Sequence, residues 1–292
     1  MQRFKLMLAI AMLLALAVSA NAQAVYSFQT VNFPGDTFTQ LLGVNNDGVI
    51  AGYHNFNLNQ GFTLILSESY STENFPDSMQ TQVIGINNHG VSDGFYIDTN
   101  GVTHGFIDNN GTFITVDYPG TTFNQLLGIN DAGQAAGYYM DAAGLFHPYI
   151  YAGLNSGEFT IVTTLGNSAQ ATGINDQGLI SGFYIDADNF THGFLAGAGG
   201  SFTTLDFPRD TSTMALGLNN ENRVVGTYTD QNGNVHGFIY NTAKKSFQQV
   251  NDPNGVNSTI INGTNDLDEI VGFYGPSNAT IGFVGHLIRD AR

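Results

Sequence analysis

The most constraining feature of this sequence is a turn motif that recurs six times, at intervals of 42 to 46 residues. Each copy begins with Gly, one variable residue and Asn, followed by Asn or Asp. The Asn side chain can accept hydrogen bonds from the backbone just after it, and a closing Gly accepts positive φ. A period of this length indicates a repeat architecture. The six copies are GVNNDG (43–48), GINNHG (85–90), GINDAG (128–133), GINDQG (173–178), GLNNEN (217–222) and GTNDLD (263–268).

Two further marks share this period, and together they predict four short strands in each repeat. One mark is a Gly-Phe pair or a variant of it, and the other is an aromatic strand that usually ends in Pro. In the third repeat the predicted strands are 125–130, 134–139, 145–151 and 159–164. The segments between them are rich in Gly, Asn and Asp, as tight turns require. Four strands in about 40–45 residues match one blade of a β-propeller.

The order of the marks predicts how the two ends of the chain pair. An aromatic-Pro strand occurs at 28–34, before the first turn motif, whereas the chain ends ten residues after Gly282. The early strand would therefore complete the last blade by pairing with 280–288, which removes two exposed sheet edges. We predict an all-β fold, a six-bladed β-propeller of four-stranded blades whose ring is closed by the N-terminal strand. Residues 25–292 would form this single domain.

These motifs resemble those of the extracellular HAF-repeat proteins of bacteria, a family named for a His-Ala-Phe triplet at the second mark. Here the triplet is His-Gly-Phe at 104–106, 192–194 and 236–238, with Gly in place of Ala, and His-Pro-Tyr at 147–149. The turn motif and the Asp-to-His spacing also match, over essentially all of 28–288. The resemblance implies an exported, propeller-like protein. It implies no chemistry, because the family has no settled biochemical activity.

The charge of the chain excludes one class of partner. Eight Lys and Arg stand against 24 Asp and Glu, which gives a formal net charge of −16, and 25–208 contains no Lys or Arg. A grip on phosphates needs clustered cations, so we expect no nucleic-acid partner and no binding to anionic membranes. We expect a monomer.

The first 24 residues have the organisation of a signal peptide. Arg3 and Lys5 precede an apolar run at 6–18, and small residues around 20–24 offer a cleavage site. The run is shorter than the roughly 20 residues that a membrane-spanning helix needs. We therefore predict export, to the periplasm or the extracellular space, with no membrane span after cleavage. The sequence contains no Cys, so packing rather than disulfides must stabilise the exported protein.

A ring of tyrosines and aspartates is the leading candidate for ligand binding. Tyr recurs at the end of the second predicted strand of each repeat, with His54 in its place in the first, and Asp follows two residues later in four repeats. Aromatic faces beside carboxylates suit a sugar, although Tyr between blades and Asp in turns can be purely structural. Arg209 in a connector is the one cation placed to meet an acidic substrate. The candidate residues are His54, Tyr96, Asp98, Tyr139, Asp141, Tyr184, Asp186, Arg209, Tyr228 and Asp230.

Metal binding has weaker support. The repeated histidines, one per blade on the predicted third strand, would not converge, so we expect each to donate to a neighbouring backbone carbonyl instead. The turns at 185–189 and 229–233 echo the alternating Asp and Asn of calcium loops. They lack the distal bidentate Glu of such a loop. We predict no metal site and no cofactor, with calcium as the alternative.

No motif for a catalytic nucleophile, a zinc protease or a phosphate loop is present, and we assign no catalytic residue. We predict an exported, non-catalytic binding or interaction propeller, with carbohydrate or another surface polymer as the ligand class. The alternatives are a glycoside hydrolase or polysaccharide lyase on the same fold, and a purely structural surface repeat protein. Symmetry distinguishes them, because a ring can bind through every blade, whereas one catalytic centre needs unique, clustered acids or bases.

Overall fold

The computed structural model describes residues 24–66, 69–153, 156–197 and 200–289, and its regular secondary structure is all β-strand. The all-β prediction is therefore confirmed. The predicted signal peptide, apart from its last residue, lies outside the described residues. The described ranges contain no helix of the length and hydropathy needed to cross a bilayer.

The strands follow one another with short turns, as the repeat pattern predicts. The first half of the chain contains β1 (Val25–Val31), β2 (Thr39–Val44), β3 (Val49–His54), β4 (Gln60–Ile65), β5 (Tyr70–Thr72), β6 (Gln80–Ile86), β7 (Val91–Ile97), β8 (Thr103–Asn109), β9 (Phe113–Val116), β10 (Asn124–Ile129), β11 (Ala135–Met140) and β12 (Phe146–Tyr151). The second half contains β13 (Phe159–Ile161), β14 (Ser168–Ile174), β15 (Ile180–Ile185), β16 (Thr191–Ala196), β17 (Phe202–Leu205), β18 (Ser212–Leu218), β19 (Arg223–Thr229), β20 (Val235–Asn241), β21 (Ser246–Gln249), β22 (Ile260–Thr264), β23 (Ile270–Tyr274) and β24 (Ile281–Arg289).

These strands pair in antiparallel groups of four that follow the sequence repeats. Five groups are consecutive in the chain: β2–β5, β6–β9, β10–β13, β14–β17 and β18–β21. A parallel bridge between Thr191 and Ser212 links the fourth group to the fifth. The last group has the order β1-β24-β23-β22, so it takes its outer strand from the opposite end of the chain. We refer to these groups below as the six sheets of the described residues.

The N-terminal strand pairs with the C-terminal strand, as the order of the sequence marks predicts. β1 lies antiparallel to β24, with Phe28 opposite Gly285 and Val31 opposite Gly282. The side chain of Phe28 packs edge-on against Phe283, with ring centroids 5.5 Å apart. The pairing of the early strand with 280–288 is thus confirmed.

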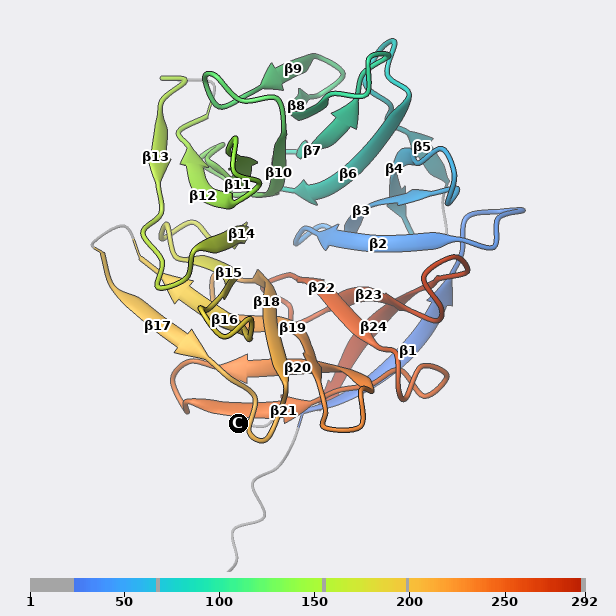
Figure 1. Cartoon of the computed structure of the whole chain (residues 1–292). Helices are drawn as coiled ribbons and strands as arrows, with labels where there is room; N and C mark the ends of the chain where they lie inside the picture. The colour runs from blue at the N-terminus through green and yellow to red at the C-terminus, as the bar shows by residue number, and fades with distance from the viewer. Residues whose placement is uncertain (1–23, 67–68, 154–155, 198–199, 290–292) are drawn as a thin grey trace, which may run out of the picture.

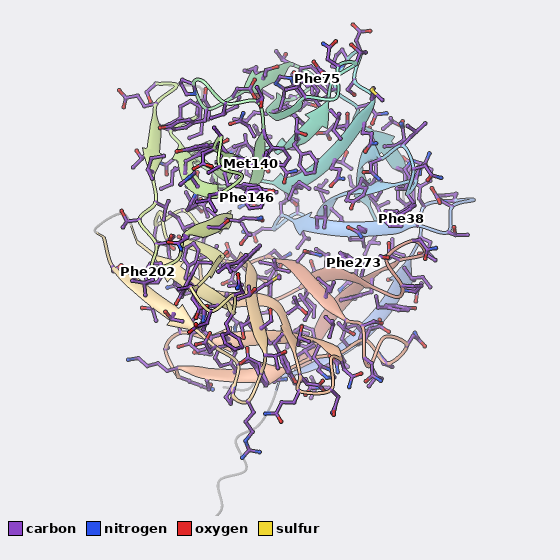
Figure 2. The ribbon with its side chains drawn as sticks, in the orientation of Figure 1. Phe38, Phe75, Met140, Phe146, Phe202 and Phe273 are labelled. Atoms are coloured by element: carbon purple, nitrogen blue, oxygen red, sulfur yellow. The ribbon has the colours of Figure 1, made fainter. Side chains whose placement is uncertain are left out.

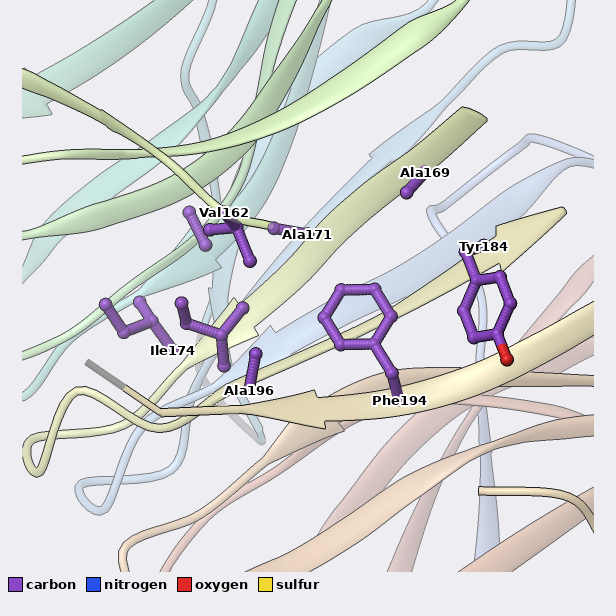
Figure 3. Close-up of a cluster of buried hydrophobic side chains, with 9 residues drawn as sticks. Val162, Ala169, Ala171, Ile174, Tyr184, Phe194 and Ala196 are labelled. Atoms are coloured by element: carbon purple, nitrogen blue, oxygen red, sulfur yellow. The ribbon is translucent and has the colours of Figure 1, made fainter. Parts of the chain in front are cut away.

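Nearest the centre of the molecule lie the strands that we call the first strands of their sheets: β2, β6, β10, β14, β18 and β22 (Figure 1). The other strands lie progressively outward, and β1 is the outermost strand of the last sheet. The hydrophobic core is divided among the spaces between neighbouring sheets. Figure 3 shows one such cluster, in which Phe194 and Ile174 of the fourth sheet pack with Val162, which follows the third. Phe194 and its repeat equivalents Phe62, Phe106, Phe238 and Phe283 are fully buried, which explains why the Gly-Phe mark recurs.

A β-bulge interrupts the pairing of every first strand with its second strand at the same repeat position. In the first sheet Leu41 pairs with Gly52 and Gly43 with Ala51, so Leu42 is the extra residue. The bulge reverses the inward–outward alternation of side chains along the strand. Leu41 lies in the core before it and Val44 lies in the core after it. The extra residues form a set that we call the bulge row: Leu42, Ile84, Leu127, Thr172, Leu216 and Asn262.

The glycine after each bulge brings neighbouring first strands into close approach. A Cβ added to Gly85 would lie 2.9 Å from the Cα of Gly128, and one on Gly128 would lie 3.0 Å from the Cα of Gly173. A Cβ on Gly263 would lie 3.1 Å from the Cα of Gly43, so the series continues from the last sheet to the first. Only glycine fits such a contact, and we call this level the glycine waist.

The asparagines of the turn motif connect the sheets through a second series of contacts. Asn45 Oδ1 accepts hydrogen bonds from the backbone N–H groups of Asp47 and Val49, which confirms the predicted Asx turn. Its Nδ2 donates to the carbonyl oxygen of Asn87 in the next sheet, 3.0 Å away. Asn265 of the last sheet donates back to Asn45 at 3.0 Å. The same donation links each intervening pair, Asn87 to Asn130, Asn130 to Asn175, Asn175 to Asn219 and Asn219 to Asn265.

Candidate functional site

The tyrosines predicted to bind a ligand have their ring faces covered by other side chains. The ring of Tyr96 stacks on Phe75 with centroids 3.7 Å apart, and His104 lies at 5.0 Å in a second stacked contact. Phe75, labelled in Figure 2, belongs to the aromatic-Pro mark. In the fifth sheet Tyr228 stacks on Phe207 at 3.7 Å in the same way.

Two further members of the ring follow this arrangement. Tyr139 stacks on Tyr118 at 4.1 Å, and His54 stacks on Phe33 at 3.5 Å. Tyr184 differs, because its repeat has no aromatic-Pro residue, and its ring is buried and stacks on His192 at 5.1 Å. A sugar needs an open aromatic face for stacking, whereas these rings pack against the connector from the preceding sheet or against a histidine. Sugar binding by the tyrosine ring stays a prediction.

The aspartates that follow these tyrosines bind the backbone of the next turn and contact histidines. Asp141 Oδ1 accepts hydrogen bonds from the backbone N–H groups of Ala143 and Leu145. Its Oδ2 lies 2.8 Å from His147 Nε2. The hydrogen bond from His147 and those from the backbone lower the pKa of Asp141. Asp98, Asp186 and Asp230 show the same pattern with His104, His192 and His236, and their pKa values are also lowered, chiefly by the turn backbone.

The repeated histidines bind carboxylates, so the expectation that they donate to backbone carbonyls was wrong. His192 lies between two carboxylates, with Nε2 3.2 Å from Asp186 and Nδ1 2.9 Å from Asp206. Burial disfavours its charge, but the hydrogen bonds to Asp206 and Asp186 outweigh that effect and raise the pKa of His192. We call these Asp–His contacts the clasps. His54 forms a related contact with Asp36, at 2.9 Å.

The clasps do not assemble a metal centre within the described ranges. Each clasp histidine lies on the third strand of a different sheet, as predicted. These residues are His104, His147, His192 and His236. No group of three or more His, Cys, Asp or Glu among the described residues is placed to share a metal ion.

Arg209 lies in the connector between β17 and β18, on an exposed turn. Its φ is +68°, the left-handed conformation that Gly35 and Gly120 adopt at the equivalent positions with φ of +81°. Arg209 therefore takes a backbone position that favours glycine. It does not line the axial cavities described next.

The structure contains a cavity at one end of the molecular axis, lined by polar and apolar side chains, that the sequence prediction missed. Its volume is about 250 Å³, and we call it the vestibule. Four glutamines near the starts of the first strands line it, together with aromatic residues from the ends of the second strands and the bulge row. The lining residues are Gln40, Leu42, Tyr53, Gln82, Ile84, Phe95, Gln125, Leu127, Gln170, Thr172, Leu216 and Asn262.

The vestibule opens on the face that carries the turns predicted to contact a ligand. Gln40 pairs with Tyr53 across the first sheet and Gln125 pairs with Tyr138 across the third. Each of these tyrosines directly precedes a predicted residue, His54 or Tyr139. His54 is the last residue of β3 and Tyr139 is the second-last residue of β11, so both lie beside the turn that follows their strand. The vestibule therefore lies on the same side of the sheets as the predicted Tyr and Asp residues, although none of the residues that line it belongs to the predicted set.

Several vestibule amides are held by specific hydrogen bonds. Tyr53 Oη donates to Gln40 Oε1 at 2.6 Å, and Tyr138 Oη donates to Gln125 Oε1 at 2.5 Å. Burial raises the pKa of Tyr53 and of Tyr138 far above the usual value, so both phenols remain donors. In Gln40 and Gln125 the amide oxygen thus accepts from a tyrosine, and Nε2 remains to donate to another group. Gln82 differs, since its Nε2 donates to Asn59 Oδ1 at 2.7 Å.

The wall of the vestibule is fixed by aromatic packing from behind. Phe38 and Phe273, which lie near each other in Figure 2, belong to one hydrophobic cluster with Leu42 and Tyr53. Phe38 is buried, and its ring centroid lies 5.8 Å from that of Tyr53. A ligand entering here would therefore meet a preformed wall.

Beyond the vestibule a cavity of about 100 Å³ lies at the level of the glycine waist, and the turn motifs follow it. The cavity at the turn end measures only about 70 Å³. The polar residues that line it bond to one another. In each turn motif the residue after the Asn donates its backbone N–H to the side chain of the equivalent residue in the next sheet, as from Asn88 to Asp131 at 2.8 Å. We call the six side chains of this position the rim: Asn46, Asn88, Asp131, Asp176, Asn220 and Asp266.

A signal for the vestibule was present in the sequence. Gln occurs at one repeat position in four of six first strands, and Met214 and Ile260 occupy it in the other two. A repeated amide on an apolar strand indicates a shared polar surface. The side of the strand on which this amide lies depends on the bulge, which the sequence alone does not reveal.

Comparison with known proteins identifies the fold. No protein-family model matches this sequence, and no curated protein matches it. Among solved structures, the chain resembles a putative TolB from Agrobacterium tumefaciens with a TM-score of 0.65, 12% identity and coverage of 90% of this chain and 98% of that one. TolB from Acinetobacter baumannii gives a TM-score of 0.57 and 13% identity over 71% of this chain, which spans about half, 53%, of that protein.

A fungal lectin from Aleuria aurantia is also similar, with a TM-score of 0.51 and 10% identity over 88% of this chain and 98% of the lectin. That lectin is described as a six-bladed β-propeller with a novel mode of fucose recognition. At such low identities these similarities show the fold alone, so the chain has a β-propeller-type fold of four-stranded sheets.

Proposed function

We propose that this chain is an exported, non-catalytic binding protein whose six sheets form one closed, six-bladed β-propeller. Two series of contacts support closure, because the asparagine hydrogen bonds and the glycine approaches both continue from the last sheet to the first. The pairing of β1 with β24 supports the same conclusion. The signal-peptide pattern at 1–24 supports export to the periplasm or the extracellular space, and N-terminal sequencing of the secreted protein tests it.

The proposed ligand class is carbohydrate or another hydroxyl-rich surface polymer. The observation that carries this proposal is the vestibule, where amides and aromatic side chains converge in one preformed cavity. Amide groups can both donate to and accept from hydroxyls, while aromatic walls contact the C–H faces of a sugar. The fucose recognition described for the Aleuria aurantia lectin shows that a related fold can carry a sugar site.

The test is binding of the purified protein to a broad panel of glycans and polysaccharides at physiological salt. A Gln125→Ala variant should weaken a selective interaction, because it removes amide contacts from the vestibule. Asp141→Asn is the matched control, since it changes a polar residue in a clasp on the same face and should leave binding unchanged. If Asp141→Asn weakens binding and Gln125→Ala does not, the binding site is at the clasps and the vestibule proposal is wrong.

The same panel addresses the two alternatives. Release of new reducing ends or unsaturated sugars from a bound polysaccharide would establish a hydrolase or a lyase. No binding by demonstrably folded protein would favour a structural surface role.

A further inference from the structure

We infer that the vestibule takes one neutral terminal sugar unit per chain, end-on, and that Asn262 is the residue that determines its specificity. This inference rests on the proposed function and specifies the ligand. In it, Asn262 Nδ2 donates a hydrogen bond to an oxygen at the deepest part of the bound unit.

Asn262 departs from the pattern of the bulge row. Leu42, Leu127 and Leu216 occupy the equivalent position in three other sheets, and Ile84 occupies it in the second. These residues lie between the glutamines and the glycine waist, so the row forms the floor of the vestibule. Asn262 therefore places a carboxamide among mainly apolar side chains, a local change of chemistry that the repeat does not require.

The donor of Asn262 lacks a hydrogen-bond partner among the described residues. Its Nδ2 atom is buried, yet no acceptor from those residues reaches it. Thr172, the other polar residue of the row, is different, because its Oγ1 donates to the Ala215 carbonyl at 2.8 Å. A buried donor without a partner is costly unless something else supplies the acceptor. Asn262 lines the vestibule, so its carboxamide can present this donor to a ligand oxygen there by turning about its terminal torsion.

The lining of the vestibule selects for a neutral ligand. None of its described residues is Asp, Glu, Lys, Arg or His. The chain as a whole carries a formal net charge of −16. A uronate or a sulfated sugar would therefore be repelled at long range and would find no cation inside the cavity. A neutral unit is satisfied by amides alone.

The dimensions favour a chain end over an internal stretch of polymer. The vestibule volume of about 250 Å³ lies below the roughly 300 Å³ at which pockets for drug-sized ligands begin, so it suits one sugar ring. Behind the floor the cavities measure only about 100 Å³ and 70 Å³, so they leave less room for a further sugar unit than the vestibule itself. Because the cavity lies on the axis and is shared by all six sheets, it provides one site per chain.

The experiment is isothermal titration calorimetry on the full protein with a defined set of probes. The probes are the methyl glycosides of glucose, galactose, mannose, fucose and xylose, the methyl glycosides of glucuronic and galacturonic acid, and oligosaccharides that end in the best neutral unit. We expect one binding site per chain, no binding of the uronates, and an affinity that rises less than about threefold when units are added behind the terminal one.

Two variants test the role of Asn262. Asn262→Leu introduces the residue already present at 42, 127 and 216, and it should fold and weaken binding about tenfold by removing one hydrogen bond to the ligand. Asp141→Asn is the control outside the lining of the vestibule, and it should bind like the wild type because Asp141 is engaged by its own turn and by His147. Thermal unfolding of both variants verifies that they are folded.

The outcomes separate this inference from the proposed function. Sugar binding with several sites per chain, with equal affinity for uronates, or with no loss in Asn262→Leu would overturn the inference and leave a carbohydrate-binding function in place. In the last of these cases Asn262 does not contribute to ligand binding. No binding of any probe or polysaccharide by folded wild-type protein would overturn both.

Discussion

The two ends of the molecular axis are built from the same repeat and differ in how their polar groups are used. At the turn end, asparagine side chains hold the turn backbone and donate to the next sheet, and the rim residues pair with one another. At the vestibule end, amides are held on one side only, and Asn262 Nδ2 has no partner among the described residues. Self-satisfied polar groups stabilise the repeat at the turn end, whereas the unused donors of the vestibule lie where the proposed ligand would bind.

The largest expected effect is a loss of folding stability when a polar residue of the turn end is replaced. Asn87→Ala should lower the free energy of unfolding by about 3 kcal/mol, because it removes two hydrogen bonds accepted from the turn backbone and one donated to Asn130. Urea unfolding followed by circular dichroism measures the change. Asn262→Leu is the contrasting variant, and it should retain or increase stability. Equal destabilisation by both variants would remove the distinction between the two ends.

The second prediction concerns a carboxyl group beside the waist, between the two ends. Asp93 is fully buried, and its Oδ1 accepts a hydrogen bond from the Gly85 N–H at 2.9 Å. Burial raises the pKa of Asp93 to about 8, and it raises the pKa of the nearby Glu73 to about 7. A raised carboxyl pKa means that folding favours the neutral form, so stability should fall as the pH rises from about 4 to about 8.

Asp93→Ala introduces the residue found at the equivalent positions 51 and 136. It should reduce this pH dependence and make the protein more stable than the wild type at about pH 9. Urea unfolding of both proteins at about pH 5, 7 and 9 tests the prediction. Parallel curves for the two proteins across this range would contradict it, and Glu73→Gln identifies the part due to the neighbouring acid.

At the vestibule we expect a substitution to affect ligand binding more than folding stability. Gln125→Ala should weaken ligand binding about tenfold and change the free energy of unfolding by only about 1 kcal/mol, because its one internal hydrogen bond comes from Tyr138. Titration with the best ligand and urea unfolding measure the two effects. A loss of stability comparable to that of Asn87→Ala would make this glutamine structural.

The smallest effect is expected at the clasps. The pKa of His192 is raised in the folded protein, so its clasp contributes stability that is fully present below the unfolded pKa of about 6.5 and is lost as the pH rises through the folded pKa. His192→Gln should therefore be slightly less stable than the wild type at about pH 6, with a smaller difference at about pH 9. Melting temperatures across this range test it, and a constant difference would show that the protonated form contributes nothing.

The repeat pattern predicted the strands, the exchange of the N-terminal strand and the Asx turns, because these depend on local chemistry repeated six times. It did not predict the contacts of Tyr96 or His192. Those depend on which side chains, Phe75 and Asp206, the strands bring alongside. The vestibule was missed for a different reason. A bulge at Leu42 reverses the alternation of the strand, and a period of two, applied to the sequence, assigns the following residues to the wrong side.

The pairing of β1 with β24 has a consequence for how the protein is made. The partner of β1 is β24, which is synthesised after every other strand of the described residues, so the final sheet stays incomplete until β24 is available. Until then β1 lacks its partner, and an unpaired strand edge invites association with another chain. At high concentration the first strand of one molecule could complete the last sheet of another. The closing strand that stabilises a single molecule is therefore also the element through which two newly made molecules could exchange strands.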